Sequence, residues 1–189
     1  MVDAFATITD LQTALGRTFD DLAQVRQVTW LLEAASTYLR DELHQQIYPQ
    51  AQATFNAWPE HGQVRLPMTP VISVDQVLDA TGNPARFDEY RGDGKITGLY
   101  SDRKVTITVT YGYDTAPEGL KKYTVVLAAQ ALITLELNLG LTAGGLSSVA
   151  IDDFKAAFAD AGAGTGMTLP DEVLDSLRAS YNGPAVVIA

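Results

Sequence analysis

The residues that could carry catalysis are few and scattered along the chain. The sequence has two histidines, His44 and His61, and no cysteine. A metal triad, or a nucleophile with its base and orienting group, needs several such side chains close together. The lack of cysteine excludes disulfides, thiolate metal sites and thiol catalysis. We therefore expect both histidines to have structural or surface roles.

Carboxylates offer the remaining route to chemistry. Adjacent pairs, which could share a proton or bind a hard cation, occur at Asp20-Asp21, Asp88-Glu89 and Asp152-Asp153. The first pair precedes a helical pattern, where negative charge favours a helix N-terminus, and the other two are expected to be solvated. A small metal-dependent hydrolase using Asp152, Asp153 or Glu118 is kept as an alternative. The sequence predicts no catalytic, metal-binding or cofactor-binding residue and no cofactor.

Charge argues against a protein that grips nucleic acid. The net charge is -10, and lysines and arginines form no run, so the chain as a whole repels a phosphate backbone. A conduit through which DNA must slide would nevertheless benefit from such walls. Residues 125–139 are too short and too often interrupted by polar groups to cross a bilayer, which takes about 20 residues. The first ten residues do not resemble a secretion signal, so we expect synthesis in the cytoplasm.

Four helices are predicted around a β segment. Thr9 and Gln12 have the spacing of a capping box for a helix over residues 10–16, and a long apolar stripe predicts a helix over 20–47, ended by Pro49. Pro117 opens a helix over 117–139 that is apolar on nearly every face, which hints at partners from a neighbouring subunit. The last helix covers 170–181.

The middle third is predicted to be antiparallel β structure, over about residues 64–113. Val105, Ile107, Val109 and Tyr111 alternate with threonines, which is typical of a half-buried strand. Pro67 and Pro70 favour an edge strand or two short strands joined by a bend. The conformation of residues 141–167 is left open between helix and extended chain.

These elements predict an α+β protein that is mainly α: a helical bundle with an antiparallel β insertion and an extended C-terminal tail. Residues 1–181 are expected to form a single domain and residues 182–189 the tail. Gly183-Pro184 breaks the last helix, and the following apolar residues are free to pair elsewhere. The tail candidates for docking are Pro184, Ala185, Val186, Val187, Ile188 and Ala189.

The order of these elements, together with their local sequences, resembles the gp6-like head-tail connector (adaptor) proteins of tailed bacteriophages. The resemblance spans nearly the whole chain and rests on the conjunction of short pieces, each of which is a cap, a strand or a turn. These pieces are Thr9-Asp10-Leu11 with Leu15; Leu31-Leu32-Glu33-Ala34-Ala35 with Tyr38-Leu39; Leu66-Pro67, Pro70-Val71, Ser73-Val74 and Val77; Val105 to Tyr111 with Gly112-Tyr113; Pro117 with Leu120-Lys121; and Leu169-Pro170 with Val173 and Leu177.

The resemblance implies a non-enzymatic virion protein of the head-tail neck. It implies a homo-oligomeric ring, commonly of twelve copies, that sits beneath the portal and extends the DNA channel without recognising DNA. Its partners would be the portal protein and the next neck protein, a stopper or tail-terminator. From the residues themselves, the tail is expected to dock on the portal or on a neighbouring subunit, for example by adding a strand. Contacts between subunits or rings are expected at the β insertion, with Pro67, Pro70, Tyr111 and Tyr113 as candidates. No membrane partner is implied.

Two other functions are weighed against this one. A different neck or tail component, such as a stopper or tail-terminator, would be expected to be β-dominated and to lack the two long helices. A ligand-binding module could use Trp58, Tyr111 and Tyr113 as an aromatic platform.

Overall fold

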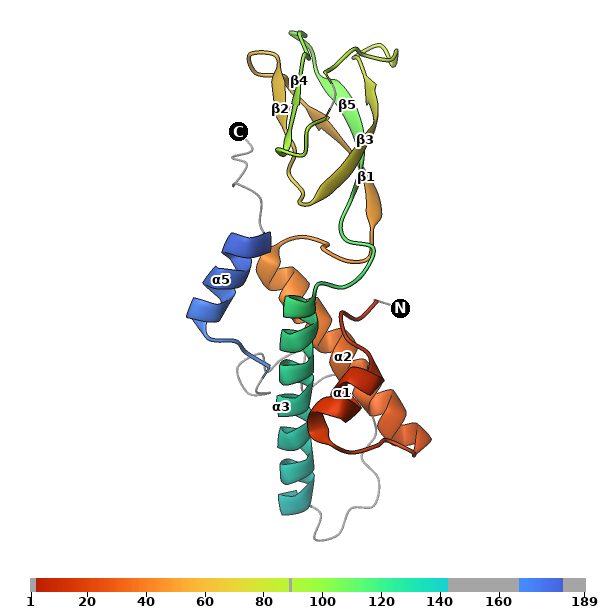
Figure 1. The fold of residues 1–189 in the computed structure, drawn as a ribbon, viewed down its shortest axis with the longest axis vertical. Helices are drawn as coiled ribbons and strands as arrows, with labels where there is room; N and C mark the ends of the chain where they lie inside the picture. Colours follow the sequence, from red (N-terminus) through yellow and green to blue (C-terminus); the bar gives the residue numbers. More distant parts are fainter. Residues whose placement is uncertain (1–2, 89, 143–166, 182–189) are drawn as a thin grey trace. The chain divides into compact units, whose positions relative to one another are not determined.

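The computed structural model describes residues 3–88, 90–142 and 167–181 (Figure 1). Among the described residues, helix exceeds strand, at 41% against 20%, which confirms the predicted α+β class with more helix than strand. The chain divides into a helical unit, residues 1–42 and 116–174, and a sheet unit, residues 43–115 and 175–189. The single domain expected over residues 1–181 stays a prediction.

The helical unit holds α1 (Ile8–Leu15), most of α2 (Leu22–Leu43) and α3 (Glu118–Thr142). Its α1 packs against α3, and an ion pair of 2.7 Å joins Arg17, just after α1, to Glu136 of α3. The predicted ranges 10–16, 20–47 and 117–139 therefore locate real helices, with ends that differ by one to four residues. Two of these differences have clear causes.

The first helix begins earlier than predicted because its cap is Thr7 and not Thr9. Thr7 Oγ1 accepts the Asp10 N–H at 3.2 Å, and the Asp10 carboxylate accepts the Thr7 N–H at 2.8 Å. This reciprocal pair is a capping box in which a charged carboxylate takes the role predicted for the Gln12 amide. A carboxylate accepts hydrogen bonds more strongly than a neutral amide, which favours the earlier start.

The second helix ends at Leu43, four residues before the predicted end. His44 has a φ of 52°, a left-handed conformation that stops the helix. The residues that follow enter the sheet unit: Ile47 is buried, and its carbonyl accepts the Tyr113 N–H at 2.8 Å. Residues 44–47 were predicted to be helical up to Pro49, but they leave the helix because they form tertiary contacts in the sheet unit.

The core of the helical unit is built from one face of each helix. Buried side chains are Phe5, Leu11, Val28, Leu31, Leu32, Ala35, Leu39, Leu120, Leu127, Ala128, Ala131, Leu132 and Leu135. The N-terminal segment is fixed on α2, because the Phe5 N–H donates to Ser36 Oγ at 2.9 Å and the Arg40 guanidinium lies 4.4 Å from the Phe5 ring centroid. This burial stabilises helices that would be marginal alone in water.

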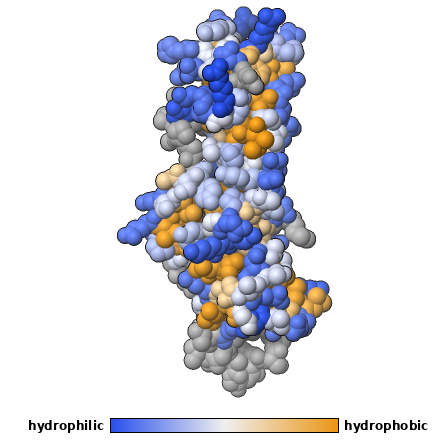
Figure 2. All heavy atoms as spheres, viewed as in Figure 1, coloured by the Kyte–Doolittle hydropathy of each residue, from blue (hydrophilic) through white to orange (hydrophobic). Residues whose placement is uncertain are grey.

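The third helix keeps apolar side chains in solvent as well as in the core. Val126 is 37% and Ile133 47% exposed, one on each side of the exposed Gln130. The three lie at positions i, i+4 and i+7 and so share one helix face. We call Val126, Gln130 and Ile133 the α3 stripe. Apolar areas do reach the visible surface of the helical unit as separate patches (Figure 2).

The sheet unit contains β1 (Ala51–Ala57), β2 (Gln63–Arg65), β3 (Val71–Leu78), β4 (Lys95–Thr97) and β5 (Val105–Tyr111). Three strands form an antiparallel sheet in the order β1-β5-β3, and β2 pairs antiparallel with β4. The β structure therefore starts at residue 51 and not near 64. Its first strand, AQATFNA, was missed because alanine and asparagine have low strand propensity and hide the alternation.

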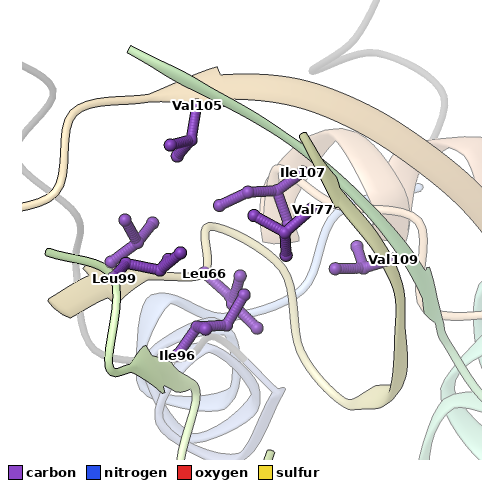
Figure 3. Packing of buried hydrophobic residues seen from close by; sticks show 8 residues of the cluster. Leu66, Val77, Ile96, Leu99, Val105, Ile107 and Val109 are labelled. Carbon is purple, nitrogen blue, oxygen red and sulfur yellow. The ribbon is translucent and has the colours of Figure 1, made fainter. Parts of the chain in front are cut away.

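A single apolar cluster lies inside this unit. Its buried members lie on or just after β2 and β4 and on β3 and β5. Seven of them are labelled in Figure 3: Leu66, Val77, Ile96, Leu99, Val105, Ile107 and Val109. Pro67 and Pro70 lie in the bend between β2 and β3, which matches the predicted pair of short strands. The bend lets the two-stranded and three-stranded sheets share one core.

A last helix, α5 (Asp171–Tyr181), follows Leu169-Pro170 as predicted for residues 170–181. The Leu169 N–H donates to the Tyr38 hydroxyl at 3.3 Å, which ties this entry to α2 within the helical unit. Asp171 and Glu172 stand in its first turn and Arg178 in its last, so their charges complement the helix dipole. The open question over residues 141–167 lies almost entirely outside the described residues.

Leu32→Asp should unfold the helical unit. Leu32 is 2% exposed, and an unpaired carboxylate at such a site costs several kcal/mol, on the order of the whole stability of a small domain. Thermal melting followed by the helical circular dichroism signal measures the effect. Thr37→Asp, at an exposed position of the same helix, is the matched control and should melt close to the unaltered protein. Equal melting of both variants would contradict the described packing of α2.

Candidate interaction surfaces

Two of the predicted contact residues come together at one end of the three-stranded sheet. The Gly112 N–H donates to the Pro70 carbonyl at 2.8 Å, and Tyr111 pairs with Ala51 of β1 and Val71 of β3. The start of β1, the start of β3 and the end of β5 therefore meet here. We call Gln45, Pro70, Tyr111, Gly112, Tyr113 and Tyr181 the strand-end cluster.

Tyr113 and Tyr181 complete the aromatic part of this cluster. Tyr113 is 37% exposed, and its backbone is held by Ile47. Burial raises the pKa of the Tyr181 phenol, and the nearby Tyr113 raises it further. The Tyr181 phenol therefore stays neutral at ordinary pH. Tyrosine rings are amphipathic and are enriched at protein interfaces.

Gln45 joins the cluster from two directions. Its side-chain oxygen accepts the Thr69 N–H at 3.2 Å, and its side-chain nitrogen donates to the carbonyl of Tyr181. The end of α5 is thereby fixed to the bend before β3. Sequence analysis missed Gln45 and Tyr181, because a single glutamine carries no periodic signal and its second partner lies 136 residues away.

Gly112 has a backbone conformation and a neighbourhood that fit glycine alone. Its φ is 89°, and a Cβ built on it would lie 3.0 Å from the Ile47 carbonyl oxygen and 3.3 Å from that of Pro49. A side chain would meet both the left-handed strain and a fixed backbone. The close passage of residues 47–50 past the end of β5 therefore depends on this glycine.

The remaining predicted candidates stand apart. Pro67 is exposed in the bend between β2 and β3 and belongs to no described contact of the cluster. The tail candidates Pro184 to Ala189 lie outside the described residues, so their docking on the portal or on a neighbouring subunit stays a prediction.

The aromatic platform predicted for a ligand-binding module is not assembled. Trp58 follows β1, whereas Tyr111 pairs with the first residue of β1, so about 20 Å of strand separates them. Trp58 is 65% exposed, and the 90% exposed Tyr100 is at the same end of the sheet, against Gly62. Tyr100 gave no sequence signal beyond its aromatic ring.

The outer face of the three-stranded sheet is polar and cross-linked by hydrogen bonds between strands. Thr54 and Thr108 hydroxyls lie 2.9 Å apart, and the Thr106 hydroxyl donates to Asn56 at 2.9 Å. Asp75 accepts from Ser73 at 2.6 Å, Thr110 at 2.7 Å and Gln52 at 3.0 Å. These hydrogen bonds hold the pKa of the Asp75 carboxyl below its ordinary value, and the bond from Ser73 has the largest effect.

Catalytic machinery is not assembled in the described part of the chain. No three histidine, aspartate or glutamate side chains there are grouped to hold a metal ion. Glu118 forms an exposed ion pair with Lys121 at 3.0 Å, and Asp152 and Asp153 lie outside the described residues. His44 ends α2, and His61 stands in the turn before β2. Within the same residues, no helix has the length and apolarity needed to span a membrane.

Gly112→Ala should destabilise the sheet unit by about 1–3 kcal/mol, because it combines left-handed strain with a clash against backbone. Gly82→Ala is the matched control: its φ is 85°, but no atom lies within 4 Å of the added Cβ. The control should therefore show the strain alone and lose less. Urea denaturation compares the two, and equal losses would mean that the contact with residues 47–50 does not matter.

Asp75 should make stability depend on pH in the acid range. A carboxyl whose folded pKa is depressed contributes stability above its unfolded value, near 3.8, and loses it as the pH falls through the folded value. The difference in unfolding free energy between the protein and Asp75→Asn should therefore shrink below about pH 4. Ser73→Ala should move the Asp75 pKa back toward its ordinary value, measured by NMR titration. A pH-independent difference would contradict this account.

The fold is similar to that of chains in known particle structures. No protein-family model matches the sequence, and no curated protein matches it. Among solved structures, a chain in the neck of an empty gene transfer agent (GTA) particle, computed with C6 symmetry, is similar over 100% of this chain and 98% of its own, with a TM-score of 0.51 and 17% identity. A chain in the virion of a native GTA particle is similar over 100% of this chain and 95% of its own, with a TM-score of 0.50 and 17% identity. The chain shares its fold, over its whole length, with these particle components.

Proposed function

We propose that this protein is a structural subunit of the neck of a tailed-phage-like particle. In this role it forms a ring beneath the portal, extends the DNA channel and joins the head to the tail. The observation that carries the proposal is the fold shared from end to end with a chain of a GTA particle neck. The resemblance of the sequence to gp6-like head-tail connectors points to the same place.

The α3 stripe supports association between copies. Val126 and Ile133 expose apolar surface on a helix whose opposite face is already buried, and such surface is stabilised when a partner covers it. We propose that a neighbouring copy does so in a ring of twelve subunits. The strand-end cluster and Pro67 would then contact the adjoining subunit or the next neck protein, a stopper or tail-terminator.

The charge of the chain suits a channel through which DNA moves. With a net charge of -10 on each subunit, the ring as a whole would repel phosphates, so DNA could pass without being held. The outer sheet face fits this role too, because its threonines and amides are bonded to one another and it carries no lysine or arginine on its described strand positions. We propose no specific recognition of DNA and no enzymatic activity.

A stopper or tail-terminator is the second candidate from the same class. We expect those proteins to be dominated by β structure, whereas helix exceeds strand here by 41% to 20%. This balance favours the connector role. A metal-dependent hydrolase receives no support from the described residues, which lack a metal-binding group of side chains.

The proposal is tested by the size and shape of the purified protein, alone and with its portal. Native mass spectrometry and negative-stain electron microscopy should show a closed ring of twelve copies, formed alone or on the portal. The ring should stack coaxially on the portal. A protein that stays monomeric at high concentration, and that does not bind the portal, would contradict the proposed function.

Ile133→Asp should abolish or weaken the ring while the subunit stays folded. The side chain is 47% exposed, so the carboxylate remains hydrated in the free subunit but would be desolvated at a subunit contact. The readouts are melting temperature and native mass. Thr37→Asp, on an exposed position of α2, controls for the added charge. Rings from Ile133→Asp as stable as those of the control would remove the α3 stripe from the interface.

A further inference from the structure

The two edges of the three-stranded sheet differ in how well they are protected. At one edge, β3 is irregular: its register with β5 shifts between Val71 and Ser73 and again between Val74 and Gln76. At the other edge, β1 keeps an unbroken register with β5 from Ala51 to Ala57. Bulges hinder the addition of a strand, whereas a regular edge invites it.

The β1 edge also lacks the other devices that prevent pairing. Its sequence, AQATFNA, contains no charge, proline or glycine, and among the described residues it pairs with no strand except β5. A seven-residue uncharged edge with backbone groups unpaired on one side is a ready template for another strand. Such an edge normally has an occupant or a cover.

The core is incompletely covered on the same side. In β5 the inward side chains of Val105, Ile107 and Val109 are at most 1% exposed. In β1 the inward residues are half-buried throughout, and Phe55 packs against the cluster from the outside. A strand added beyond β1 would place its own inward side chains over Phe55 and extend the apolar core.

The chain itself supplies a segment with matching chemistry. Residues 185–189, Ala-Val-Val-Ile-Ala, are apolar, uncharged and rich in β-branched side chains, so they fit an uncharged edge beside an open core. They leave the described structure after Tyr181, whose carbonyl is held by Gln45 in the strand-end cluster, where β1 also begins. Eight residues beyond Tyr181 can span roughly 26 Å, more than the length of β1.

We propose that residues 185–189 of one copy add as a strand to the β1 edge of a neighbouring copy. The inference rests on the proposed ring. Donor and acceptor are different parts of the same chain, so the contact is heterologous and repeats from copy to copy until the ring closes. Each subunit then gives one strand and receives one, and no β1 edge in the ring stays open.

The test uses engineered disulfides, which are unambiguous because the chain has no cysteine. Val187→Cys is combined in turn with Gln52→Cys, Thr54→Cys or Asn56→Cys, three exposed positions on the outer face of β1 that together sample the register of the added strand. After mild oxidation of the assembled ring, at least one pair should give a ladder of covalent oligomers on a denaturing gel. The ladder should collapse to monomer on reduction.

The matched control is Val187→Cys with Gln76→Cys. Gln76 is exposed on the outer face of β3, opposite Thr108, and so tests the other edge of the same sheet. This pair should give no ladder. An equal ladder from the control, no cross-link from any β1 position, or a cross-link closed within one chain would each overturn the inference.

Truncation after Asn182 separates this inference from the proposed function. The truncated subunit should melt like the full chain but form rings less readily, measured by native mass spectrometry with and without portal. Rings that form as before yet no longer bind the portal would make the portal the acceptor of the tail and overturn the inference while the neck function stands. If the full chain forms no ring under any of these conditions, the proposed function fails instead.

Discussion

The pairing of β5 with both of its neighbours is the interaction on which the sheet unit depends. Its seven residues place Val105, Ile107 and Val109 in the core at no more than 1% exposure, and its threonines bond to β1 on one side and to Asp75 of β3 on the other. Strand pairing, core packing and the polar outer face all pass through this one segment. The distant segments around residues 51 and 71 belong to one sheet only because β5 pairs with both of them.

The same dependence explains which elements could be predicted from the sequence. The strand β5 carries its full signal locally, because β-branched residues alternate between valine or isoleucine and threonine. The helices likewise carry local caps and periodic stripes. The strand β1 does not, since Ala51, Ala53 and Ala57 are strand-forming only when β5 pairs with them. Its existence is a tertiary effect, and so is the end of α2 at Leu43.

The candidate surface was predictable only in part for a related reason. Pro70, Tyr111 and Tyr113 were identified from residue type and turn position, and the structure brings Pro70 and Tyr111 together through Gly112. Gln45 and Tyr181 could not be identified in this way, because their roles arise from a contact between segments 136 residues apart. Residue type predicts which interactions a side chain can form, whereas long-range contacts determine which residues it meets.

The described surface has polar groups that hydrogen-bond to one another, and it also has apolar and backbone groups that another molecule could cover or pair with. On the outer sheet face, hydroxyls and amides donate to acceptors on the same strand or on another strand, and the carboxylate of Asp75 accepts three hydrogen bonds. Such a face gains little by binding another protein, because association would exchange bonds already made. The α3 stripe and the β1 edge differ, since apolar area at one and backbone groups at the other lack a partner among the described residues. These two regions lie on separate units of the chain, so a copy that used both could contact neighbours through two independent surfaces. In a closed ring of identical subunits, each copy contacts its two neighbours through two different surfaces.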